Sequence, residues 1–206
     1  MAYELSAGNR TFAKRYGNVV VALGDRKNHT LRRIAGGKSG KGVTTAYDPS
    51  ISGDGTVVAY AVVSADPMAA ESDTATRIGI YDAATGQTTL IPRAGAYEPA
   101  VSADGHFVAF TAFAKDGTLQ VFSYDRKARA VRQVSRDVAE AWAPSISADG
   151  SLIAYAATTS PGGRSRIWMR DLRQAKPKAM TPASHDFVDA PSLSANGTAL
   201  TYTRQL

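Results

Sequence analysis

A twelve-residue stretch that occurs four times constrains the fold of this chain more than any other feature. The copies begin at Pro49, Pro99, Pro144 and Pro191 and read PSISGDGTVVAY, PAVSADGHFVAF, PSISADGSLIAY and PSLSANGTALTY. Successive prolines are 50, 45 and 47 residues apart. A fixed period of this length indicates a repeated supersecondary unit, so each unit is expected to pack against its neighbours in the chain.

Each copy predicts two short strands joined by a tight turn. Residues 50–52 alternate between apolar and polar side chains, and residues 57–63 form a β-branched and aromatic run, which is typical of strand, turn and strand. Asp and Asn tolerate positive φ and Gly adopts it readily, so we expect positive φ at both central turn residues. The turn explanation makes a metal-ligand role for the aspartates unnecessary. The four turn dipeptides are Asp54-Gly55, Asp104-Gly105, Asp149-Gly150 and Asn196-Gly197.

A second pair of strands follows in each complete unit. The third strands end in Asp, and a polar turn leads from each of them into a fourth strand. Four short antiparallel strands in a unit of this length are typical of a propeller blade. We therefore predict an all-β fold, a β-propeller of about four blade-equivalents. The third strands are residues 77–82, 118–125 and 166–171, and the fourth strands are residues 88–91, 130–134 and 178–180.

The two ends of the chain are predicted to be incomplete blades of one domain over residues 1–206. Residues 1–6 align with residues 58–63, which makes them a second strand, and residues 18–23 and 31–34 follow as strands three and four. The second strand is then present twice. Either a ring of four blades closes with one copy displaced, or the propeller is an open arc that a longer chain or a partner completes; open edges favour an oligomer. The predicted blades are partial over 1–45, full over 46–93, 94–137 and 138–183, and partial over 184–206.

The repeat resembles a known family. A P-S-[IL]-S-[AG]-[DN]-G stretch, followed by a strand of the type I80-Y81-D82 and the turn Thr85-Gly86, is similar to the TolB-type β-propeller repeat, which is WD-like. The resemblance covers residues 46–206. The resemblance implies a propeller fold and a periplasmic or secreted protein. Proteins with this repeat include scaffolds, gating propellers of serine peptidases and some sugar-acid lyases. No signal peptide is visible, so the compartment stays open.

Composition limits the classes of binding partner that we expect. The chain has 24 Lys and Arg against 18 Asp and Glu, a net charge of +6, with much of the excess in residues 10–41 and 126–136. Basic residues in turns and edge strands also prevent aggregation, and no nucleic-acid motif accompanies them, so nucleic acid is not an expected partner. The absence of cysteine excludes disulfides and thiolate sites. No apolar run approaches the roughly 20 residues that a membrane span needs.

The residues before each repeated proline are the candidate ligand-binding residues. We expect them in loops that approach the central channel, where the aromatic rings of Tyr47, Tyr97 and Trp142 would surround one opening and bind a peptide or a sugar. The alternative is that the aromatics pack between adjacent blades and that the acids accept backbone hydrogen bonds. The candidates are Tyr47, Asp48, Tyr97, Glu98, Trp142 and Asp189.

Catalytic chemistry is not expected. The histidines His29, His106 and His185 fall at different phases of the repeat, so they are not expected to converge on a metal or cofactor. His185, with Asp186 and Asp189, forms one local polar cluster, but a metal site needs several ligands at defined geometry. The sequence therefore predicts a non-enzymatic scaffold that binds a protein or peptide. The alternatives are a carbohydrate-binding or carbohydrate-processing propeller, and a structural repeat whose main property is self-association.

Overall fold

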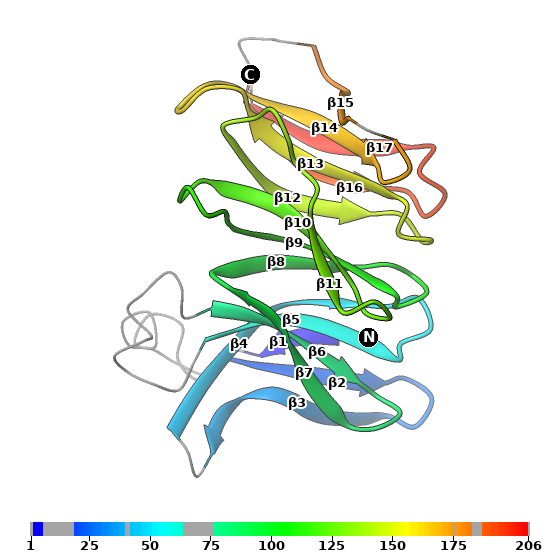
Figure 1. The fold of residues 1–206 in the computed structure, drawn as a ribbon. Coiled ribbons are helices and arrows are strands. Elements are labelled where there is room, and N and C mark those ends of the chain that lie inside the picture. Colours follow the sequence, from blue (N-terminus) through cyan, green and yellow to red (C-terminus); the bar gives the residue numbers. More distant parts are fainter. Residues whose placement is uncertain are drawn as a thin grey trace. The chain divides into compact units, whose positions relative to one another are not determined.

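The computed structural model describes residues 2–5, 19–39, 42–63, 76–174, 176–182 and 187–205. In these ranges every helix or strand element is a β-strand, which confirms the predicted all-β fold (Figure 1). The strands are β1 (Ala2–Leu5), β2 (Val20–Asp25), β3 (Thr30–Ser39), β4 (Gly42–Ile51), β5 (Val57–Val63), β6 (Thr76–Asp82), β7 (Gln87–Ala94), β8 (Ala96–Val101), β9 (Phe107–Phe113), β10 (Leu119–Asp125), β11 (Ala130–Gln133), β12 (Glu140–Ile146), β13 (Leu152–Thr158), β14 (Ser165–Asp171), β15 (Lys178–Ala179), β16 (Phe187–Leu193) and β17 (Leu200–Gln205).

Within each antiparallel sheet, neighbouring strands are consecutive in the sequence, and the sheets resemble propeller blades. Strands β8 to β11 form one four-stranded sheet, β12 to β15 form another, and β16 and β17 form a two-stranded sheet. Strands β1 to β7 form a single seven-stranded sheet, because the end of β3 pairs with the start of β4, with Gly37 opposite Thr44. That pairing joins the predicted first partial blade to the first full blade.

Packing divides the chain into two compact units. The first consists of Met1–Ile51 and Gly55–Pro99, and the second of Ser52–Asp54 and Ala100–Leu206. The predicted single domain over residues 1–206 and its blade boundaries stay predictions. The described part of the chain contains no helix that could cross a membrane.

The first unit confirms the predicted strand order at the N-terminus. Tyr3 in β1 lies opposite Ala22 in β2, at the same offset along the chain as Tyr60 opposite Gly79 in β5 and β6. Tyr60 is buried, and its hydroxyl lies 3.0 Å from Thr88 Oγ1. Burial raises the pKa of this phenol. The core of the unit consists of Val21, Ala46, Val58, Tyr60 and Tyr81.

The second unit has its main core on the strands of two complete blades. Strands β9, β10 and β13 are buried at consecutive positions, so both of their faces are covered. Methyl-sized alanines on these strands let neighbouring sheets approach closely. The centre of this core is Tyr155, which is fully buried. The cluster consists of Ala109, Val121, Val134, Ala141, Ile153, Tyr155 and Ala157.

The Asp-Gly and Asn-Gly turns differ from the prediction in one respect. Only the glycine of each dipeptide has positive φ in these four fully described turns, with values from 66° to 76°, so the expectation of two such residues is wrong. The loop has four residues: Ser147 N–H donates to Leu152 O (2.9 Å). Asp149 instead accepts hydrogen bonds from Ser147 Oγ (2.7 Å) and Ser151 N–H (3.0 Å). These bonds, the first above all, lower the pKa of Asp149 to about 2.

Candidate functional site

The six predicted site residues lie inside the first strands of the blades, and the expectation that they occupy preceding loops is wrong. The residue before each repeated proline has positive φ. In β4, β12 and β16 this residue lies at a β-bulge. In β12, Trp142 lies opposite Ala156 and the next paired residue is Ser145, opposite Ala154. The strand therefore resumes pairing after the bulge instead of beginning there. The φ values are 50° at Asp48, 51° at Glu98, 49° at Ala143 and 48° at Ala190.

The structure brings two of the six residues together. Trp142 in β12 and Asp189 in β16 belong to the second unit, and the indole Nε1–H donates to Asp189 Oδ1 at 2.8 Å. The other four, Tyr47, Asp48, Tyr97 and Glu98, belong to the first unit; the tyrosines are half-buried and the acids exposed. The predicted ring of aromatics around one opening stays a prediction.

Phe187, the first residue of β16, is a site residue that the sequence analysis missed. Its ring stacks on Trp142 with centroids 6.3 Å apart and an angle of 19° between the planes, and it remains 37% exposed. Phe187 precedes Asp189 by two residues, so both side chains leave the strand on the same face. This alternation could have identified Phe187 had the strand been predicted to begin before the bulge.

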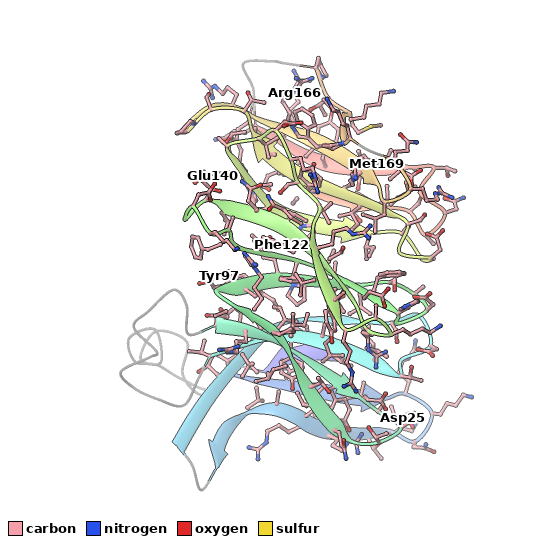
Figure 2. The ribbon with its side chains drawn as sticks, viewed as in Figure 1. Asp25, Tyr97, Phe122, Glu140, Arg166 and Met169 are labelled. Atoms are coloured by element: carbon pink, nitrogen blue, oxygen red, sulfur yellow. The ribbon has the colours of Figure 1, made fainter. Side chains whose placement is uncertain are left out.

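A pocket of about 440 Å³ lies beside this aromatic pair, and its size is in the range of ligand-binding pockets. Its walls come from β12, from the end of β13, from the turn between β13 and β14, and from the start of β16, all in the second unit. Figure 2 labels one lining residue, Glu140, where β12 begins. The pocket is lined by Glu140, Trp142, Thr158, Gly162, Gly163, Arg164 and Phe187.

Thr158 has a buried polar atom that no residue in the described ranges satisfies. The residue is 5% exposed, and its Oγ1 has no hydrogen-bond partner. Its backbone is satisfied, since Ala139 N–H donates to Thr158 O at 2.7 Å. Leaving a buried hydroxyl unpaired costs about 1–3 kcal/mol. Thr158 lines the pocket while its Oγ1 is itself buried. A ligand in the pocket can supply the missing partner once the side chain rotates to another rotamer.

The pocket also carries one acidic and one basic side chain. Glu140 and Arg164 are both exposed, and neither forms an ion pair with any other residue in the described ranges. Glu140 lies directly opposite Thr158 in the β12–β13 register, and Trp142 shares its face of β12. An anion, a cation, a hydroxyl and an aromatic surface can thus all contact one ligand.

The remaining polar candidates do not gather at the pocket. His106 Nε2 lies 2.9 Å from Asp125 Oδ1, and its ring stacks on Phe107, while His29 lies in the turn between β2 and β3. His185 and Asp186 lie outside the described residues. Among those that are described, no three His, Cys, Asp or Glu side chains are grouped to hold a metal ion.

Comparisons with known proteins identify the fold. No family model and no curated protein sequence matches the chain. TolB from Acinetobacter baumannii is similar in structure, with a TM-score of 0.65 and 23% identity over 96% of this chain and 48% of TolB. A protein assigned as TolB from Agrobacterium tumefaciens gives a TM-score of 0.61 and 16% identity over 87% of this chain and 61% of its own.

A propeller from a peptidase matches as well. The β-propeller domain of the trilobed protease from Pyrococcus furiosus, which has an open velcro topology, gives a TM-score of 0.53 and 13% identity over 100% of this chain and 74% of its own. Identities this low show the fold and not the activity. The chain is thus structurally similar to TolB β-propeller domains, and it spans about half the length of the Acinetobacter protein.

Proposed function

We propose that this chain is a non-enzymatic protein- or peptide-binding module of the TolB-like propeller type, and that the pocket beside Trp142 is its binding site. The observation that carries the proposal is the buried Thr158 hydroxyl without a partner, next to the half-buried Trp142 and the exposed Phe187. Stacked aromatic rings offer a large contact area with few rotatable bonds, and such side chains dominate the energetics of protein interfaces.

The chemistry of the lining residues supports binding over catalysis. Among the pocket residues, Glu140 is the single carboxylate and no histidine is present. The nearby Asp189 carboxylate already accepts hydrogen bonds from Trp142 Nε1–H and from Ala190 N–H at 2.7 Å. Hydrolysis of a glycosidic bond typically uses two carboxyl groups that flank the bond. The pocket supplies one free carboxylate, which suits recognition.

A peptide selection tests the proposal. Immobilised wild-type protein is used to select from a random peptide library, and the selected peptides are titrated against Trp142→Ala. We expect Trp142→Ala to weaken binding at least tenfold, as for truncation of an interface hot spot. Tyr202→Ala is the matched control, because this tyrosine is 41% exposed and does not line the pocket. Unchanged binding by folded Trp142→Ala protein would contradict the assignment, as would a failure to select any peptide.

A second candidate is carbohydrate binding at the same pocket. The stacked rings of Trp142 and Phe187, with the Glu140 carboxylate and the Thr158 hydroxyl beside them, also match what a sugar ring requires. A glycan array separates the two functions. Saturable sugar binding that Trp142→Ala abolishes would replace the peptide proposal.

Self-association is a third candidate, and it rests on another part of the chain. Strand β17 has one sheet neighbour, β16, within the described ranges, and all of its side chains except that of Leu200 are exposed. Exposed strand edges pair with other chains. We propose that copies associate through this edge. Sedimentation at micromolar concentration tests this association. A protein that stays monomeric over the whole concentration range would exclude association through β17 at these concentrations.

A further inference from the structure

The arrangement of charges across the pocket specifies the kind of peptide that fits, given the proposed function. Three adjacent strands, β12, β13 and β14, form this part of the sheet. Glu140 in β12 lies opposite Thr158 in β13, and Thr158 lies opposite Ser165 in β14. Arg164 directly precedes Ser165 in the chain. Glu140 therefore lies on one side of Thr158 in the sheet and Ser165 on the other, and Arg164 lines the pocket from the turn that leads into Ser165.

Sheet geometry gives the distance between the backbone positions of Glu140 and Ser165, the residue next to Arg164. Neighbouring strands are about 4.8 Å apart, so positions on strands separated by one strand are roughly 10 Å apart. An extended peptide advances about 3.3 Å per residue. A segment that crosses the pocket from the Glu140 side to the Arg164 side thus spans about three residues.

The middle of such a segment lies over the remaining pocket groups. Trp142 and Phe187 supply an apolar surface, which suits an apolar or aromatic side chain between the two charged residues. The Thr158 hydroxyl is buried and unpaired, and a peptide backbone carries both a donor and an acceptor at every residue. Once the Thr158 side chain rotates towards the pocket, the backbone between the charged residues can satisfy this hydroxyl.

We infer that the pocket binds an extended peptide with one basic and one acidic residue about three positions apart and an apolar residue between them. The basic side chain pairs with Glu140, the acidic side chain pairs with Arg164, and the backbone bonds to Thr158 Oγ1. Because both charged protein groups are exposed, they determine sequence preference more than total affinity. Affinity comes mainly from the apolar residue on Trp142 and Phe187.

The peptide selection, repeated with charge variants, tests this inference. Wild-type protein should enrich peptides with the paired opposite charges. Glu140→Gln should lose the enrichment of the basic residue and keep that of the acidic one, and Arg164→Gln should do the reverse. Each should weaken binding of the best wild-type peptide about two- to fivefold, as for an exposed ion pair. The double variant Glu140→Arg with Arg164→Glu should enrich the two charges in reversed order.

Thr158 provides an independent readout. In the free protein, Thr158→Val removes a hydroxyl that has no partner, so the melting temperature should stay the same or rise. Peptide affinity should nevertheless fall about five- to tenfold, as for loss of one buried hydrogen bond, and Thr158→Ser should keep most of it. A residue with a purely structural role would not separate stability from binding in this way.

The outcomes distinguish the inference from the function on which it rests. If wild-type protein selects no peptide, the proposed function fails. If it selects peptides without a pair of opposite charges, or if Glu140→Gln and Arg164→Gln select the same sequences as wild type, the inference is overturned and peptide binding stands. Reversed charge order in the double variant would establish the inference, because nothing but the exchange of the two charges differs.

Discussion

Tyr155 and Tyr202 occupy the same position in the repeat, yet one is fully buried and the other is 41% exposed. Tyr155 lies in β13, which has β12 and β14 on its two sides, whereas Tyr202 lies in β17, whose single sheet neighbour among the described strands is β16. The repeat position alone therefore does not determine burial. A third strand and a packed neighbouring sheet bury the tyrosine.

The residues around the two tyrosines follow the same difference. Strand β13 has the alanines Ala154, Ala156 and Ala157, and all three are fully buried. The corresponding positions in β17 are Thr201, Thr203 and Arg204, and all three are exposed. Small apolar side chains permit close packing of sheets, while Thr and Arg suit an edge strand that remains in contact with solvent.

The largest expected effect comes from truncating the two tyrosines. Tyr155→Ala should lower the free energy of unfolding by about 3–5 kcal/mol, because it leaves a cavity in the core. Tyr202→Ala should change it by less than about 0.5 kcal/mol. Urea unfolding measures both. A large loss from Tyr202→Ala would break the comparison, since β17 would then be covered in solution.

The turn glycines of the same two blades should also differ in how much stability the protein loses when each is replaced by alanine. Gly150 and Gly197 both have positive φ, so alanine costs about 1–2 kcal/mol at either. A Cβ at Gly150 would also collide with the ring and Cβ of Phe107, whereas a Cβ at Gly197 would meet mainly the end of the Leu152 side chain, which can rotate away. We expect Gly150→Ala to be worse by a further 1–3 kcal/mol in urea unfolding. Equal losses would mean that the Phe107 ring moves freely.

The hydroxyls of the repeated aromatic position give a smaller effect. Tyr155 Oη is buried and has no hydrogen-bond partner among the described residues, while Tyr60 Oη contacts Thr88. Phe110 shows that this position accepts a ring without a hydroxyl. Tyr155→Phe should be neutral or stabilise by up to about 1 kcal/mol, and Tyr60→Phe should destabilise by about 0.5–1.5 kcal/mol. Thermal unfolding of both variants, measured in parallel with the wild-type protein, tests these two expectations. A clear loss from Tyr155→Phe would reveal a partner for its hydroxyl, such as a bound water.

The smallest expected effect is a dependence of stability on pH. The turn of the third repeat, with Asp149, should contribute to it, and the turn of the fourth repeat, with Asn196, should not. The folded-state pKa of Asp149 is lowered to about 2, so its stabilising contribution is complete above about pH 4 and is lost as the pH falls towards 2. Asn196 makes the equivalent contacts to Ser194 and Thr198 but does not titrate.

The test is Asp149→Asn, with the free energy of unfolding measured from pH 5 to pH 2 at low salt. Wild-type protein should lose more stability than the variant over this interval. The difference should stay below about 1 kcal/mol, because the carboxylate is exposed and screened by solvent. Parallel pH curves would show that the hydrogen bonds of Asp149 are not retained in solution.

Much of the fold followed from local patterns. The position of β1 was predicted by aligning residues 1–6 with residues 58–63, and its pairing with β2 has the same register as β5 with β6. The geometry before each proline was not predicted, because an L-residue with positive φ next to proline has no clear sequence signature. For that reason the sequence predicted first strands that begin after the bulge, whereas in the structure they begin before it. Phe187 and Glu140 were overlooked as a result.

The amino-acid sequence alone determined the repeat, the strand order and the places where the chain turns, since these depend on alternation of side chains and on residues a few positions apart. The tertiary structure decided which copies of the repeat are buried and which residues form the pocket. Trp142 and Thr158 come from the consecutive strands β12 and β13 of one sheet, whereas Phe187 comes from β16 of another sheet. The proximity of Phe187 to the other two results from the packing of one sheet on the next, which no local pattern encodes.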